Sequence, residues 1–167
     1  MGERAFTYIE ILAAIMVLSI ALIPLLSQFY IGFQANQTGE LVSQATNLAE
    51  ALMEEIKTKR FDENEFPVEP VNPASLGTDS GETIADRRTL DDIDDYHTLQ
   101  ENPPTTSDGI VLNEFSLFRR QVTVDYVALS SGAWIASGVR TYYKRITVNV
   151  THPKIGSRAL ETIMAHY

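Results

Sequence analysis

The chain has 167 residues, 44% of them hydrophobic, and a formal net charge of −9 at pH 7. Nucleic-acid phosphates would repel so acidic a chain, which argues against a nucleic-acid partner. There is no cysteine, so disulfides and thiol chemistry are excluded. Because the first thirty or so residues hold a disproportionate share of the apolar side chains, the rest is expected to form one small domain with a modest core.

The chain opens with a short charged segment followed by a long apolar run. From Ile11 to Leu26 the apolar series is interrupted only by one serine and one proline. A bilayer core needs about 20 mostly apolar helical residues, so residues 8–31 or thereabouts are predicted to span a membrane. This run contains a carboxylate, Glu10. An ionisable group in such a segment costs on the order of 2.5–3.5 kcal/mol and is read as functional by default.

The segment Arg4-Ala5-Phe6-Thr7-Tyr8-Ile9-Glu10 resembles the processing site of type IV prepilins and type II secretion pseudopilins. The resemblance implies a leader of residues 1–5, removed by a prepilin peptidase that cuts between Ala5 and Phe6. It further implies that Phe6 becomes the N-methylated first residue and that Glu10 meets the N-terminal amine of a neighbouring subunit in a filament. The family usually has Gly where this chain has Ala5.

A secretory signal peptide or a plain signal anchor is the alternative interpretation of the same N-terminus. Glu10 lies inside what would be the apolar core of such a signal, and no small-x-small cleavage pair follows the run. The helical pattern also continues well beyond it. These features favour the prepilin-like interpretation.

One long helix is predicted over residues 6–60. Beyond the apolar run, apolar residues recur at steps of three or four and form one stripe, as expected of a helix that packs on a sheet. The stripe comprises Leu41, Ala45, Leu48, Leu52 and Ile56, with Ala49 and Met53 beside it. Pro24, Gly32 and Gly39 weaken the middle of the helix. This weakness indicates either ordinary kink tolerance or local melting during filament assembly.

Residues 61–113 are rich in proline and glycine and are predicted to be a long irregular connection. Its most distinctive feature is a run of four carboxylates in five positions, Asp91, Asp92, Asp94 and Asp95. Closely spaced Asp side chains can supply the six to eight oxygens that Ca²⁺ takes, and some pseudopilins bind calcium in the corresponding region. The other interpretation is a solvated acidic turn with Ile93 and Tyr96 against the core. No cofactor is otherwise expected.

The last third of the chain predicts a sheet. Apolar and polar residues alternate over 117–129, 141–151 and, more weakly, 158–167, with turn residues between the runs. Trp134, in the connection Ser130–Gly138, is either a contact anchor or, preferably, a cover for the end of its own sheet. The fold class is therefore α+β and pilin-like, with the long N-terminal helix packed on a three- to four-stranded antiparallel sheet. The globular domain is expected to cover residues 61–167.

Catalysis finds no support in the sequence. His97, His152 and His166 lack metal-ligand spacing, and no nucleophile motif is present. The expected function is structural: a pilus or pseudopilus subunit, with other pilin subunits, the prepilin peptidase and the inner membrane as partners. Before assembly its domain would lie in the periplasm. The alternative function is a monomeric, membrane-anchored binding module with an acidic loop.

Overall fold

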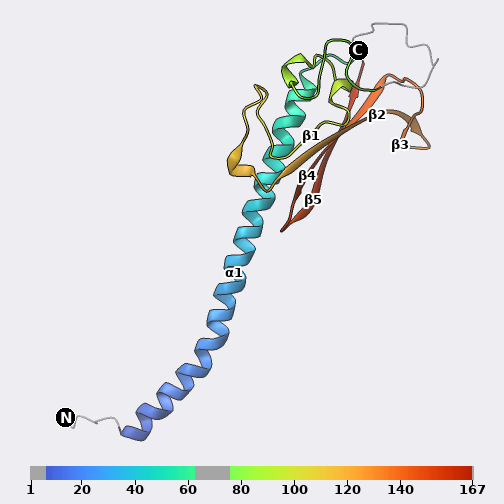
Figure 1. The fold of residues 1–167 in the computed structure, drawn as a ribbon. Coiled ribbons are helices and arrows are strands. Elements are labelled where there is room, and N and C mark those ends of the chain that lie inside the picture. Colours follow the sequence, from blue (N-terminus) through green and yellow to red (C-terminus); the bar gives the residue numbers. More distant parts are fainter. Residues whose placement is uncertain (1–6, 63–75, 167) are drawn as a thin grey trace. The chain divides into compact units, whose positions relative to one another are not determined.

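The computed structural model describes residues 7–62 and 76–166. One long helix, α1 (Tyr8–Lys57), precedes a segment that holds short helical turns and one short strand, and the other strands follow (Figure 1). The chain divides into two compact units, a smaller one of Met1–Leu41 and a larger one of Val42–Tyr167. The predicted helix over residues 6–60 is confirmed from Tyr8 to Lys57, and Phe6 lies outside the described residues.

The part of α1 in the smaller unit is helical throughout its described residues. Pro24 lies inside the helix without ending it, although proline removes one backbone hydrogen bond. Two nearby serines bond to the backbone four residues earlier: Ser27 Oγ donates to Ile23 O at 3.1 Å, and Ser19 Oγ donates to Ile15 O at 2.7 Å. Local melting of this region during assembly stays a prediction.

The part of α1 in the larger unit is amphipathic, as its sequence predicts. The buried side chains follow one stripe: Ala45, Leu48, Ala49, Leu52, Met53 and Ile56. Leu52 and Ile56 are almost inaccessible, at 1% and 0% exposure. Burial of such side chains contributes about 1.5–3 kcal/mol each relative to exposure, so this stripe holds the helix to its domain.

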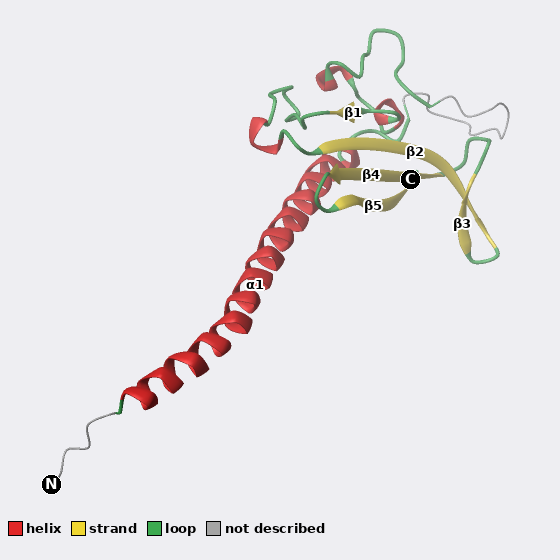
Figure 2. Cartoon of the chain, turned by 60° about the horizontal axis from the view of Figure 1, so that its bottom comes forward, coloured by secondary structure: helices red, strands yellow, loops and turns green. Residues whose placement is uncertain are grey.

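Three long antiparallel strands form the body of the sheet (Figure 2). They are β2 (Arg119–Ser130), β4 (Tyr143–His152) and β5 (Gly156–Ala165), and they correspond to the three predicted runs. The sheet order is β1-β2-β4-β5, with Val122 opposite Val148 and Val148 opposite Leu160. With α1 these strands give the α+β, pilin-like layout that the sequence predicts.

Two short strands raise the sheet to five, beyond the predicted three or four. β1 (Gln100–Glu101) pairs with β2 inside the segment predicted to be irregular. β3 (Ala133–Ala136) lies in the connection that contains Trp134 and forms a hairpin with β2. Ser131 and Gly132, with φ of 52° and 82°, supply the positive φ values that a tight two-residue hairpin turn needs. Trp134 pairs with Leu129, and its ring lies 4.8 Å from that of Tyr143.

The core of the larger unit lies on one face of β2 and β4. Val122, Val124, Ile146, Val148 and Val150 are all completely buried. The connection before the sheet adds Leu90, Ile93, Tyr96 and Leu99, which are 0–2% exposed. Its described part, from residue 76 onward, contains three single-turn 3₁₀ helices: Arg87–Thr89, Asp94–Tyr96 and Asn113–Phe115. The connection is thus irregular, as predicted, but it is anchored by its own apolar side chains.

Charged residues also occupy the buried face of the sheet. Arg120 alternates in phase with the buried valines of β2, and Lys144 does so on β4. They are 3% and 0% exposed, respectively. A buried charge is tolerated only when paired and hydrogen-bonded, so each of these residues marks a polar cluster under the sheet.

Candidate functional site

The first candidate site is the apolar part of α1 in the smaller unit. Its large side chains are exposed on every face of the helix, from Tyr8 (78%) and Ile9 (75%) to Phe29 (70%) and Phe33 (62%). By length and composition this helix can cross a membrane. Exposed apolar surfaces of this extent commonly mark contact with lipid or with another protein.

Glu10 lies in the first turn of this helix. Its backbone N–H donates to Thr7 O at 3.1 Å, which closes that turn. Within residues 7–62 and 76–166 the Glu10 carboxylate has neither a hydrogen bond nor an ion pair. A negative charge near a helix N-terminus gains about 0.3–1 kcal/mol from the helix dipole, less than its cost in lipid. The predicted processing residues Ala5 and Phe6 lie outside the described residues.

The second candidate site is the acidic turn at Asp91–Asp95. Ile93 and Tyr96 are 1% and 0% exposed, so the apolar residues of the turn do lie against the core. Asp92 Oδ1 accepts from the backbone N–H groups of Asp94 (3.0 Å) and Asp95 (3.2 Å). Asp95 Oδ2 accepts from those of Asp91 (2.9 Å) and Asp92 (3.0 Å). Two of the four carboxylates therefore build the turn itself.

The other two carboxylates are paired with cations. Asp91 Oδ2 accepts a hydrogen bond from the Arg60 guanidinium group. The Arg60 backbone also holds this turn, because Ile93 N–H donates to Arg60 O at 3.0 Å. Asp94 Oδ1 accepts from Lys144 Nζ at 2.6 Å. Burial, with a hydrogen bond to Asp92, raises the pKa of Asp94 to about 7 even though Lys144 acts in the opposite direction.

The structure does not bring the four aspartates together as one ligand set. The carboxylate oxygens that do converge belong to Glu82, Asp91 and Asp95, and they lie within 4.8 Å of one another. Asp91 Oδ1 is a buried oxygen that accepts no hydrogen bond from the described part of the chain. Burial and a hydrogen bond to Glu82 raise the pKa of Asp95 to about 7. This crowding would be relieved by a proton or by a hard cation such as Ca²⁺. Calcium binding stays a prediction, and the oxygens that converge include one from Glu82, which the sequence did not indicate, and none from Asp92 or Asp94.

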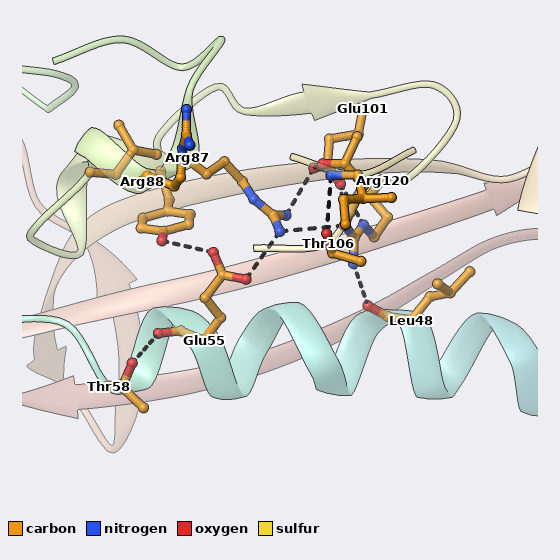
Figure 3. Close-up of polar contacts among 12 residues, drawn as sticks. Leu48, Glu55, Thr58, Arg87, Arg88, Glu101, Thr106 and Arg120 are labelled. Carbon is orange, nitrogen blue, oxygen red and sulfur yellow. Dashed lines mark hydrogen bonds and ion pairs between the residues drawn. The ribbon is translucent and has the colours of Figure 1, made fainter. Parts of the chain in front are cut away.

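A buried ion network, also missed from the sequence, connects α1 to the sheet within the larger unit (Figure 3). Arg87 bonds Glu55 of α1 (Nη2–Oε2, 3.1 Å) and Glu101 of β1 (Nη1–Oε1, 2.8 Å). Arg120 Nε donates to the second Glu101 oxygen at 2.6 Å, and its Nη1 donates to Leu48 O of α1 at 3.3 Å. Burial lowers the pKa of Arg120, and Glu101 opposes this effect. The network fastens the irregular connection to both layers.

The three histidines are engaged separately. His97 Nδ1 accepts from the Val124 N–H of β2 at 3.2 Å. His152 Nδ1 accepts from Lys154 N at 3.1 Å, and its ring lies 4.6 Å from that of Phe118. The ring of His166 meets Phe61 edge-on at 5.1 Å. His152 is 4% exposed because it stands on the buried face of β4.

Comparison of the chain with protein-family models, with curated proteins and with solved structures gives no match.

Proposed function

We propose that this protein is a structural subunit of a type IV pilus or type II secretion pseudopilus that assembles through α1. The observation that carries the proposal is the exposed apolar part of α1, with a carboxylate in its first turn, Glu10, that has no ion pair or hydrogen bond within residues 7–62 and 76–166. The α+β layout of helix on antiparallel sheet supports it, as does the prepilin-like segment Arg4–Glu10.

The assembly mechanism follows from the energetics of Glu10. In lipid the unpaired carboxylate is costly. In a bundle of α1 helices it gains the N-terminal amine of Phe6 from a neighbouring subunit, so leaving the membrane relieves the cost. The pair also defines the axial register between neighbours. The subunit resides in the inner membrane with its domain in the periplasm before assembly, and in the filament afterwards.

The moderate chain length and the irregular connection favour a minor or accessory subunit over a major one. A major subunit must pack identically along the whole filament, whereas an accessory subunit tolerates an idiosyncratic connection between helix and sheet. The length of 167 residues includes the proposed leader of residues 1–5.

The mass of the mature chain tests the processing step. Co-expression with a prepilin peptidase should yield a chain that begins at N-methyl-Phe6, identified by mass spectrometry of the intact protein and of its N-terminal peptide. An unprocessed Met1 end in material recovered outside the cytoplasm would contradict the proposal. That result would instead favour the monomeric, membrane-anchored binding module.

Replacement of the assembly carboxylate tests the pairing step. Glu10→Gln keeps the shape of the side chain and removes its charge, so the variant should insert and be processed while filament yield falls. A fall of about tenfold or more is expected, because 1.4 kcal/mol of lost interaction is a factor of ten. The matched control is Glu50→Gln, on the exposed face of the amphipathic part of α1. Normal filaments from Glu10→Gln would refute the pairing.

A further inference from the structure

A buried amine and a buried carboxyl group are in direct contact beneath the sheet of the larger unit. Lys144, near the start of β4, has a side chain that is 0% exposed, and its Nζ lies 2.6 Å from Asp94 Oδ1. Asp94 comes from the acidic turn, 50 residues earlier, and its side chain is 9% exposed. The fold therefore places a primary amine against a carboxyl group that is remote in sequence.

The surroundings of this pair are aromatic and contain a second carboxylate. Lys144 Nζ lies 4.6 Å from the ring centre of Phe61 and 5.0 Å from that of Tyr126. Asp62 Oδ2 is 3.8 Å from the same nitrogen. Asp62 is itself held in place, because Arg140 Nη2 donates to both of its oxygens and the Tyr126 hydroxyl donates to Oδ2 at 2.9 Å.

We propose that Lys144 and Asp94 condense into an intramolecular isopeptide bond between Nζ and Cγ. The neutral amine attacks Cγ of the protonated carboxyl group, the C–N bond forms, and one Asp94 oxygen leaves as water. Nζ starts with three protons as an ammonium group: it gives the first to the Asp94 carboxylate before the attack, loses the second after the C–N bond forms, and keeps the third in the amide, so two protons leave with that oxygen as water. Asp62 accepts a proton from Nζ and returns it to the leaving oxygen. The step is redox-neutral and needs no co-reactant.

Positioning and burial make the condensation feasible. Reacting atoms about 3–3.5 Å apart form a near-attack pair, and fixed geometry of this kind gives very high effective molarities. A contact of 2.6 Å between Nζ and Oδ1 places Cγ, one bond beyond Oδ1, within about 4 Å of Nζ, so that only a small movement is needed for attack. Exclusion of water protects the amide from hydrolysis. The reaction also replaces a buried ion pair, whose desolvation is costly, with a neutral amide.

The bond would join β4 to the acidic turn in a chain that has no cysteine for a disulfide. It would close a covalent loop from residue 94 to residue 144, across β1, β2 and β3. Pulling the domain open would then require breaking a covalent bond. This inference concerns the larger unit alone and does not depend on whether the chain forms filaments.

Mass spectrometry of the full chain tests the proposal directly. The denatured wild-type protein should be lighter by one water molecule than its sequence, and trypsin should leave a branched peptide that joins residues 89–119 to residues 141–145. Lys144→Met should have the unmodified mass. The matched control Lys154→Arg removes an exposed lysine and should keep the branched peptide.

A second variant tests the proposed role of Asp62 in proton transfer. Asp62→Asn keeps the size of the side chain and should fold, yet the branched peptide should be absent or form at least tenfold more slowly in a time course. If Lys144→Met fails to fold, the wild-type mass remains decisive. A folded wild-type chain that retains its full mass after prolonged incubation, with separate linear peptides, would overturn the proposal.

Discussion

Removing Glu101 should break the buried ion network at its centre. Glu101 is 7% exposed and lies between the guanidinium groups of Arg87 and Arg120, whose side chains are 4% and 3% exposed. Glu101→Ala leaves Arg120 buried without a carboxylate partner. Breaking a buried pair from one side costs about 3–5 kcal/mol. Arg120 keeps its bonds to Leu48 O and Thr105 O, so a loss near the lower end of this range is expected.

The assay is chemical unfolding of the full-length protein in detergent micelles. Trp134, the single tryptophan, lies in the sheet of the larger unit and reports its unfolding by fluorescence. A loss of about 3 kcal/mol should also lower the melting temperature by roughly 10 °C in a domain of this size.

Two controls distinguish loss of the buried Glu101–Arg120 ion pair from a nonspecific loss of stability. Glu54→Ala breaks a pair of similar length, Glu54–Lys57 at 2.7 Å, whose Glu54 side chain is 69% exposed, so it should cost less than about 1 kcal/mol. The double variant Glu101→Leu with Arg120→Met removes both charges and should recover most of the stability lost in Glu101→Ala. If Glu101→Ala lowers the free energy of unfolding no more than Glu54→Ala does, the buried ion network does not stabilise the domain, which would refute the prediction.

Three further results are expected. The pKa values of Asp94 and Asp95 rise from 3.8 to about 7 on folding, so the folded state binds more protons than the unfolded state between about pH 4 and pH 7. In chelating buffer the free energy of unfolding should therefore fall as the pH rises from about 4 to 7. Asp95→Asn should reduce this dependence of stability on pH. If calcium binds at Glu82, Asp91 and Asp95, a chelator should lower the melting temperature at pH 7.5 in the wild type but not in Glu82→Gln. An unchanged wild-type melting temperature would contradict calcium binding at this turn. Ile146→Ala, at a completely buried site, should cost about 2–5 kcal/mol by denaturant titration, and a cost below 1 kcal/mol would show that the sheet face is not the core.

The Lys144–Asp94 contact bears on the pH experiment. An isopeptide bond would remove Asp94 from the titration and leave Asp95 as the group that changes charge. Comparison of the pH slope in wild type and Lys144→Met therefore gives an independent check on the cross-link. The slope should be steeper in Lys144→Met, where Asp94 keeps a free carboxyl group.

Local sequence pattern was sufficient for the helix and the three long strands. The stripe from Ala45 to Ile56 has the 3.6-residue period of a helix with one buried face, and β2 and β4 have the period of two. Both signals arise from neighbours along the chain. The apolar run of the N-terminal part and the carboxylate of Glu10 at its start are likewise visible in the sequence alone, because neither depends on a contact with a remote segment.

Only the tertiary structure decided which charges are buried and what they meet. Arg120 and Lys144 occupy positions on the buried, apolar face of their strands. No local sequence pattern predicts that Arg120 pairs with Glu101 or that Lys144 pairs with Asp94. Glu82 joins Asp91 and Asp95 through a turn of the irregular connection, and Asp92 and Asp94 are drawn away from it. The physical reason is that pairing of buried charges depends on contacts between remote segments, whereas the periodicity of apolar residues is set within each segment.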